Sequence, residues 1–255
     1  MVDTLYRSRW LIQALVVRDL VLRYRGTIVG FFWTLLNPLL FVGIYTLVFS
    51  VYLRNPMPHF SLFLLTGMIP WQWFSMSISM GTSSIVDGRA YVGKSVFRPA
   101  VLIFVPIFSN FINYLLFMPL LVVVVALSHG TLGWPLLALP LLIVTQFILT
   151  TGLLFIAATF NVFFRDLQQL LATILTMLFF LSPIFFTLQQ IPARFRGLTL
   201  ANPMAGIVVG YQNLFYYNTW PDMRLLGLSL AIAVAVLWLG LSVFRRYEDA
   251  LPDYL

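Results

Sequence analysis

Stretches without Asp, Glu, Lys or Arg dominate the chain and set its organisation. A charged side chain inside the hydrocarbon of a bilayer is costly, and about 20 apolar residues cross it as a helix. The charge-free runs at 26–53 and 55–86 each hold one such span, and the run at 99–164 holds two. The runs at 167–193 and 225–244 hold a fifth and a sixth. The pattern predicts an all-α integral membrane protein with six transmembrane helices.

The segment at 191–223 follows the fifth span. Its part at 197–223, with a single charge at Asp222, is long enough for another span, but its composition argues against one. It contains Asn202, Pro203, Gln212, Asn218 and Pro221. Polar groups and helix breaks are tolerated at membrane depth only where protein or water surrounds them. We therefore predict a periplasmic re-entrant helical segment between spans five and six, forming an outer lid.

The first 25 residues combine basic and apolar positions. A secretory signal is a weak interpretation, because the apolar stretch is short, no small-residue cleavage site follows it and further charges come next. Leu11, Leu15 and Leu22 lie near one line of a helix, and Arg18 and Arg25 are spaced along it. The pattern predicts an interfacial amphipathic helix at 1–25 on the cytoplasmic face.

The Lys and Arg residues divide unequally between the two sides of this six-span topology. Eleven fall on the side of the termini and four on the other. The eleven are Arg7, Arg9, Arg18, Arg23, Arg25, Arg89, Lys94, Arg98, Arg165, Arg245 and Arg246, and the four are Arg54, Arg194, Arg196 and Arg224. The positive-inside rule then places both termini in the cytoplasm.

Composition excludes several classes of protein. Of 255 residues, 61% are hydrophobic and 9% are charged, so an ordinary soluble domain is excluded. The absence of cysteine excludes disulfides, thiolate metal sites and a cysteine nucleophile. The net charge is +7, and the basic residues flank the apolar runs. This pattern favours a role in membrane orientation over nucleic-acid binding. We read the chain as one membrane domain over residues 1–255, without repeats or linkers.

The sequence carries no energy source of its own. No Asp, Glu, Lys or Arg lies inside a predicted span, which disfavours ion-coupled transport. No GxxxxGK[ST] loop is present, so hydrolysis of ATP by that motif is excluded. The predicted cytoplasmic loops offer Asp87 and Asp166, which are too far apart in sequence for the carboxylate cluster of a metal-dependent membrane enzyme. We expect no enzyme activity, no metal and no cofactor.

Five sequence blocks in a fixed order carry a resemblance to a known family. The first begins at Arg18 and reads RDLVLRYRGTIVGFFWTLLNPLL. The others are GMIPWQWFS at 67–75, NVFFRDL at 161–167, LSPIFFTLQQIP at 181–192 and NPMAGIVVGYQNLFYY at 202–217. Together they resemble the ABC-2 type permeases that export bacterial polysaccharides, and the O-antigen branch most of all.

The resemblance implies a mechanism and a set of partners. It implies a homodimer of six-helix subunits in the bacterial inner membrane, paired with a dimer of a separate cytoplasmic ATPase that binds the ATP. The cargo would be a polyprenyl-linked polysaccharide. An ABC-2 permease for a small amphipathic compound, and an enzyme or scramblase acting on polyprenyl lipids without ATP, stay open as alternatives.

Charged residues at the predicted cytoplasmic face are the candidates for coupling and entry. The loop at 83–99 is short, basic and mixed with aromatic residues, and the resemblance implies that it is a gate or coupling element. The candidates for gating or ATPase coupling are Arg89, Lys94, Arg98, Arg165 and Asp166, and those for the substrate entrance are Arg18, Arg23 and Arg25. Topological anchoring is an alternative role for the entrance residues.

Aromatic residues gather near the predicted ends of the spans. Interfacial belts explain such residues, but a path for sugars would use them too, because the apolar faces of sugar rings stack on aromatic rings. The candidates for a glycan path are Phe31, Trp33, Trp71, Trp73, Phe74, Phe185 and Phe186. Asn110, Asn113, Gln146 and Asn161 are neutral polar groups in or near the spans. They fit hydrogen bonds between helices or contacts along a sugar path.

Overall fold

A computed structural model describes residues 8–25, 30–52, 54, 57–92, 98–129 and 133–255, with the side chains of residues 24, 31, 34, 35, 92 and 129 left out. All the regular structure in these ranges is helical. The helices are α2 (Arg9–Tyr24), α3 (Trp33–Thr46), α4 (Phe60–Thr82), α5 (Ser84–Asp87), α6 (Arg89–Val92), α7 (Ala100–His129), α8 (Leu139–Phe163), α9 (Leu167–Leu181), α10 (Ala193–Ala201), α11 (Pro203–Phe215) and α12 (Met223–Tyr247). Shorter turns are η1 (Gly30–Phe32), η2 (Leu47–Tyr52), η3 (Trp134–Ala138), η4 (Leu188–Gln190) and η5 (Leu251–Tyr254).

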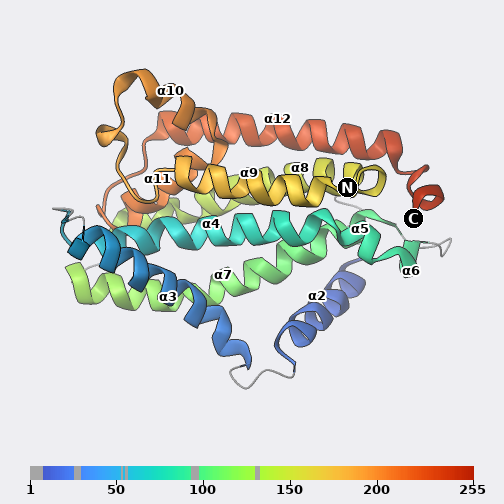
Figure 1. Cartoon of the computed structure of the whole chain (residues 1–255), viewed down its shortest axis with the longest axis horizontal. Helices are drawn as coiled ribbons and strands as arrows, with labels where there is room; N and C mark the ends of the chain where they lie inside the picture. The colour runs from blue at the N-terminus through green and yellow to red at the C-terminus, as the bar shows by residue number, and fades with distance from the viewer. Residues whose placement is uncertain (1–7, 26–29, 53, 55–56, 93–97, 130–132) are drawn as a thin grey trace.

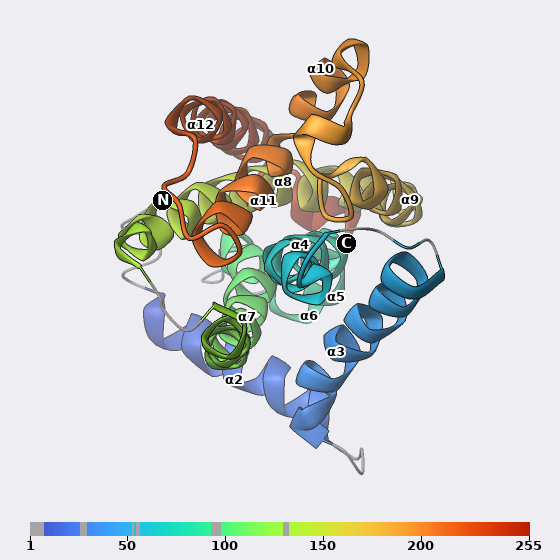
Figure 2. The ribbon, with the colours of Figure 1, turned by 90° about the vertical axis from the view of Figure 1, so that its left-hand side faces the viewer.

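The helices form an elongated bundle with α4 at its centre (Figures 1 and 2). Most residues of α4 are buried, and it packs against α7, α8, α11, α3 and α9. At one end of the bundle lie α5, α6 and η5, and at the other lie α10 and the start of α4 (Figure 1). The all-α prediction is confirmed for the described residues.

Among the described residues, three helices are long and apolar enough to cross a membrane, namely 100–128, 134–163 and 223–247. Two shorter apolar helices cover 36–52 and 167–181. Helix α4 has 23 residues without a charge, but its serine, threonine and glutamine side chains make it less apolar. The structure thus supports the prediction of an integral membrane protein. That the chain crosses the membrane six times stays a prediction.

Helices α8 and α12 make the most extensive contact of the bundle, and glycine explains how they come so close. A Cβ atom on Gly240 of α12 would lie 2.3 Å from the carbonyl oxygen of Gly152 on α8. A Cβ on Gly152 would lie 2.5 Å from the backbone nitrogen of Leu237. Small residues permit this backbone contact, which is typical of helix pairs packed in membranes.

The N-terminal helix packs on the bundle through an unexpected face. Ile12 and Val16 of α2 are buried, and the helix lies against α7. Leu11 and Leu22, which the sequence placed on the apolar line, are exposed. Helix α2 therefore has two apolar faces. One face packs on the protein, and the other is exposed.

The predicted lid segment contains two helices, α10 and α11, which differ in how far they are buried. Helix α10 is mostly exposed, whereas α11 is buried against α4, α8 and α12. The Asn202 side chain donates to Ser182 Oγ at 2.7 Å, and Gln212 Nε2 donates to the Pro183 carbonyl at 2.7 Å. The two sequence blocks at 181–192 and 202–217 are therefore joined by hydrogen bonds. Their re-entrant position in the membrane stays a prediction.

Candidate functional site

Two cavities lie along one side of the central helix and define the candidate site. One turn of α4 supplies residues to both, since Trp73 faces the first cavity, Trp71 faces the second and Gln72 lines both. The first lies among α2, α3, α4 and α7, and the second among α3, α4 and α9. We call the first the amide pocket and the second the seam pocket.

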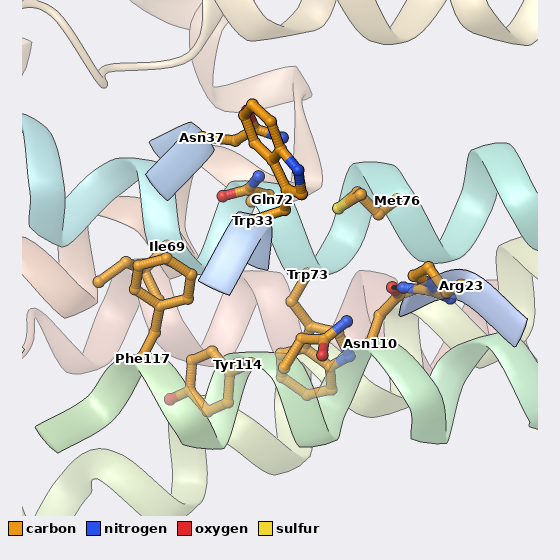
Figure 3. Close-up of a pocket in the computed structure, with 11 residues that line it drawn as sticks. Arg23, Trp33, Asn37, Ile69, Gln72, Trp73, Met76, Asn110, Tyr114 and Phe117 are labelled. Atoms are coloured by element: carbon orange, nitrogen blue, oxygen red, sulfur yellow. Dashed lines mark hydrogen bonds between the residues drawn. The ribbon is translucent and has the colours of Figure 1, made fainter. Parts of the chain in front are cut away.

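The amide pocket has a volume of about 270 Å³ and mixes aromatic with polar side chains (Figure 3). Its described lining comprises Arg23, Trp33, Asn37, Ile69, Gln72, Trp73, Met76, Asn110, Asn113, Tyr114 and Phe117. The indole ring of Trp33 is accessible, since this residue is 40% exposed. Trp73 is buried and packs against Phe111 and Tyr114. Four carboxamides in one small cavity give it many neutral hydrogen-bonding groups.

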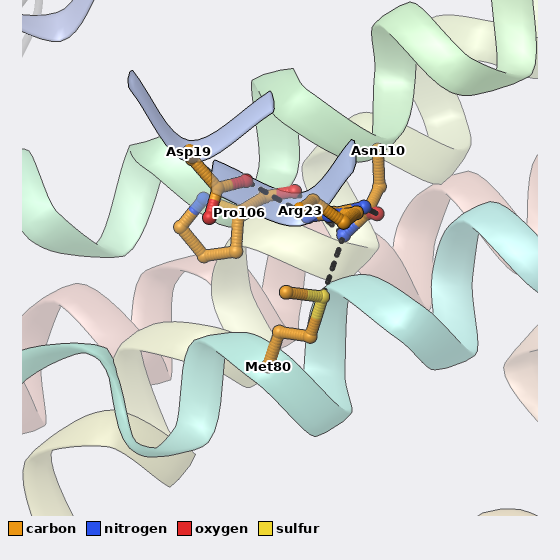
Figure 4. A network of polar contacts seen from close by, with 5 residues as sticks. All are labelled: Asp19, Arg23, Met80, Pro106 and Asn110. Carbon is orange, nitrogen blue, oxygen red and sulfur yellow. Dashed lines mark hydrogen bonds and ion pairs between the residues drawn. The ribbon is translucent and has the colours of Figure 1, made fainter. Parts of the chain in front are cut away.

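A polar network joins α2 to the bundle at one end of this pocket (Figure 4). Arg23 forms an ion pair with Asp19 at 2.8 Å and donates to Asn110 Oδ1 at 2.8 Å. Asn110 Nδ2 donates to the carbonyl of Pro106 at 2.9 Å and contacts Met80 Sδ at 3.9 Å. Arg23 is only 17% exposed, and its charge is balanced by Asp19. It therefore differs from Arg18 and Arg25, which are exposed.

The seam pocket has a volume of about 250 Å³ and is bordered by an aromatic cluster. Trp71 and Phe179 have ring centroids 5.8 Å apart, and Phe179 and Phe185 are separated by 5.1 Å. Tyr45 of α3 packs edge-on against Phe185 at 4.8 Å. The cluster thus joins α3, α4 and α9 with the segment after α9.

The predicted glycan-path residues divide among different surroundings. Trp33 and Trp73 line the amide pocket, and Trp71 lines the seam pocket. Phe74 lines a third, apolar cavity of about 480 Å³ between α4, α8 and α9. Phe185 is buried in the aromatic cluster, and Phe186 packs against the core. The side chain of Phe31 lies outside the described residues. The structure therefore does not bring these seven residues together in one cavity.

The predicted coupling residues lie at the end of the bundle that holds α5 and α6. Arg89 of α6 is exposed, as are Arg165 and Asp166 in the turn between α8 and α9. Lys94 lies outside the described residues. Burial and the neighbouring Asp249 raise the pKa of Glu248, and the positive charges of Arg98 and Arg245 oppose this, so Arg98 acts electrostatically on the C-terminal end of α12.

A contact that the sequence did not predict links two of these regions. Arg18 of α2 donates a hydrogen bond to the Tyr91 hydroxyl on α6, and the guanidinium lies 5.9 Å from the centre of the tyrosine ring. The predicted entrance helix and the predicted gate are therefore in direct contact. Only the basic and aromatic character of both segments hinted at it.

Neutral polar residues within the helices serve in part as links between helices. Gln146 of α8 donates to the carbonyl of Pro70 on α4 at 2.8 Å, and Asn110 joins α7 to α2. Asn37 and Gln72 line the amide pocket but were not predicted as site residues, although both lie in the quoted blocks. The described residues hold no cluster of His, Cys, Asp or Glu suited to a metal ion.

The long apolar helices are those of a helical integral membrane protein. The chain belongs to the ABC-2 type transporter family, whose model matches residues 11–216. It is 38% identical over 255 residues to the O-antigen export system permease protein RfbA of Myxococcus xanthus, covering 98% of each chain. A Klebsiella pneumoniae protein of the same name is 30% identical, again over 98% of each chain. The polysialic acid transport protein KpsM of Escherichia coli is 25% identical over 94% of each.

These similarities confirm the family drawn from the five sequence blocks. The chain is an ABC-2 permease homologous to permeases of O-antigen and polysaccharide export. The family implies an ABC ATPase partner and a polysaccharide substrate.

Proposed function

We propose that this chain is the transmembrane subunit of an ATP-driven exporter that moves a polyprenyl-linked polysaccharide across the inner membrane. The full-length similarity to O-antigen export permeases carries the proposal. The amide and aromatic lining of the two cavities supports it, because sugars need stacking surfaces and neutral hydrogen-bonding partners. Hydrolysis of ATP belongs to a separate subunit.

The proposed topology has six spans and both termini in the cytoplasm. Helices α7, α8 and α12 supply three spans, and α3 with η2, α4 and α9 supply the others. The end that holds α5, α6 and the basic residues of α12 then faces the cytoplasm. Helices α10 and α11 form the outer lid.

We assign the seam pocket to the face where a second copy of the chain completes a pore. Helices α3 and α9 border the pocket and leave Ile44, Met177 and Phe180 exposed. Thr173 and Thr176 of α9 are exposed as well, and their hydroxyls donate to the carbonyls of Gln169 and Ala172 within the helix. A homodimer built on these two helices encloses the pocket from both sides.

The cytoplasmic residues take roles in entry and coupling. Arg18 and Arg25 are exposed and suited to the pyrophosphate of the lipid-linked substrate. Arg89, Lys94, Arg98, Arg165 and Asp166 form the surface on which the ATPase acts. The contact of Arg18 with Tyr91 carries movement of α6 to α2.

Purification from native membranes followed by reconstitution tests this function. Mass spectrometry of the gently purified protein should find a stoichiometric ATPase together with a bound polyprenyl-linked glycan. Vesicles that hold the complex should then move this glycan with ATP and not with a non-hydrolysable analogue. Movement of the lipid by the chain alone, without nucleotide, would show that the protein is a scramblase and not an ATP-driven exporter. ATP-driven transport restricted to small amphipathic compounds would show that the substrate is not a polysaccharide.

A further inference from the structure

We propose that the amide pocket is a subsite for one uncharged sugar ring of the transported glycan, separate from the pore. The inference rests on the proposed function, because the family supplies the polysaccharide. The proposal goes further in two respects. It locates a sugar-binding site within one subunit, and it assigns that site to a sugar ring and not to the lipid pyrophosphate.

The charge balance of the pocket excludes a strong anion site. Arg23 carries the positive charge among the described lining residues, and Asp19 lies 2.8 Å from it. The pair sums to zero, whereas a pyrophosphate linkage carries at least two negative charges. An anion entering this partly buried space would lose its hydration and meet the Asp19 carboxylate as well as the Arg23 guanidinium. The pocket therefore favours a neutral ligand.

Unused hydrogen-bonding groups show which neutral ligand fits. The side-chain amides of the half-buried Gln72 and the exposed Asn37 have no hydrogen-bond partner among the described residues. The buried Nε of Arg23 has no partner there either. Amides offer donors and acceptors together, as sugar hydroxyls do, so each hydroxyl can pair in either sense.

The half-exposed ring of Trp33 supplies the apolar contact that a sugar also needs. Trp33 and Gln72 lie close together in the pocket, while Trp73 forms part of its floor with Tyr114 (Figure 3). A pyranose presents C–H groups on its faces and hydroxyls around its edge. A ring stacked on Trp33 therefore directs its hydroxyls toward the amides.

Size restricts the ligand to a single ring. The cavity of about 270 Å³ is just below the range of roughly 300–1,000 Å³ that is typical of small-molecule sites. It holds one residue of a glycan and not a stretch of polymer. Gln72 also lines the seam pocket, so a ring held in the amide pocket lies beside the proposed pore.

Saturation-transfer NMR on the permease–ATPase complex in nanodiscs tests the proposal. The probes are the methyl glycosides of glucose, galactose, mannose, rhamnose and N-acetylglucosamine, together with methyl glucuronide and inorganic pyrophosphate. We expect saturable binding of at least one neutral glycoside, weakened roughly two- to tenfold by Trp33→Ala and by Gln72→Ala. Trp33→Phe keeps a ring and should retain binding. Trp238→Ala, which removes an exposed tryptophan of α12, should have no effect.

The outcomes separate this inference from the proposed function. Absence of glycoside binding, binding that Trp33→Ala leaves unchanged, or stronger binding of glucuronide or pyrophosphate that is lost in Arg23→Met would each overturn it. Variants are compared only where gel filtration and melting match the wild type, and Gln72→Ala serves as the weakened variant where Trp33→Ala fails this. Polymer transport by the wild-type complex without such binding refutes the subsite alone. Glycoside binding without ATP-driven polymer transport refutes the exporter alone.

Discussion

Arg23 shows how one side chain can fix the position of a whole helix. Its planar guanidinium contacts Asp19 through one nitrogen and Asn110 through another. Lysine carries the same charge but has no fork with which to span two partners. The interaction therefore depends on the shape of the group as well as on its charge.

We expect Arg23→Lys to destabilise the protein by about 1–3 kcal/mol, because a partly buried acceptor loses its charged partner. The measurement is the melting temperature of the purified protein in detergent. Arg25→Lys is the matched control, since Arg25 is exposed two positions away and should tolerate lysine. Equal melting of both variants would contradict the role given to the Arg23 network.

The residues of the site differ in how far the sequence could predict them. Trp33 and Trp73 were found because aromatic side chains near span ends are conspicuous, and Arg23 because it is charged. Asn37 and Gln72 were not, because a neutral amide in an apolar run gives no sign of whether it bonds a neighbouring helix or faces a cavity. Gln146 and Gln72 look alike in sequence, yet Gln146 bonds Pro70 and Gln72 lines two pockets.

At the scale of elements, the contact between α8 and α12 depends on two glycines. Adding one methyl group at Gly240 places it against the Gly152 carbonyl, and the helices must separate. We expect Gly240→Ala to lower stability by about 1–3 kcal/mol, the usual cost of overpacking. Thermal unfolding in detergent measures this.

Gly227→Ala on the same helix is the control, because a Cβ there meets nothing within 4 Å. Alanine also has the higher helix propensity, so this variant should melt no lower than the wild type. A loss of stability at both positions would mean that α12 is sensitive to any change and not to the contact with α8.

The contact between α2 and α6 makes a prediction about coupling. Tyr91→Phe removes the hydroxyl that accepts from Arg18 and keeps the ring. We expect the polymer exported per ATP hydrolysed to fall by roughly fivefold, the lower end of typical coupling between sites. Tyr52→Phe, at an exposed tyrosine, is the control. An unchanged ratio in Tyr91→Phe would show that movement reaches the bundle without this contact.

The boundaries of elements were predicted less well than their existence. The charge-free run at 99–164 resolves into α7 and α8, as expected, because two apolar helices are separated by a short polar break. The run at 26–53 instead divides into α3 and the π-turn η2. The packing of Ile12 and Val16 of α2 on the bundle was not predicted, since periodicity shows that a face is apolar but not what covers it.

For the whole molecule, the proposed dimer can be tested directly because the chain has no cysteine. Met177→Cys places a single thiol on the exposed face of α9, and we expect it to form a disulfide-linked dimer on mild oxidation in membranes. Trp238→Cys places an equally exposed thiol on α12 and should stay monomeric under the same conditions. Cross-linking at position 238 alone would move the dimer interface to the opposite side of the bundle.

The bundle is unequal in stiffness around the amide pocket. Helix α4 is surrounded by α7, α8 and α11, whereas α3 packs mainly on α4 and α2 packs mainly on α7. A limb supported from one side can swing outward while the glycine-sealed pair α8 and α12 stays closed. A sugar in the pocket therefore meets one rigid wall and one compliant wall. For the proposed sugar subsite, this asymmetry predicts that rings of different size are accommodated by movement of α3, while α4 and α7 keep their positions.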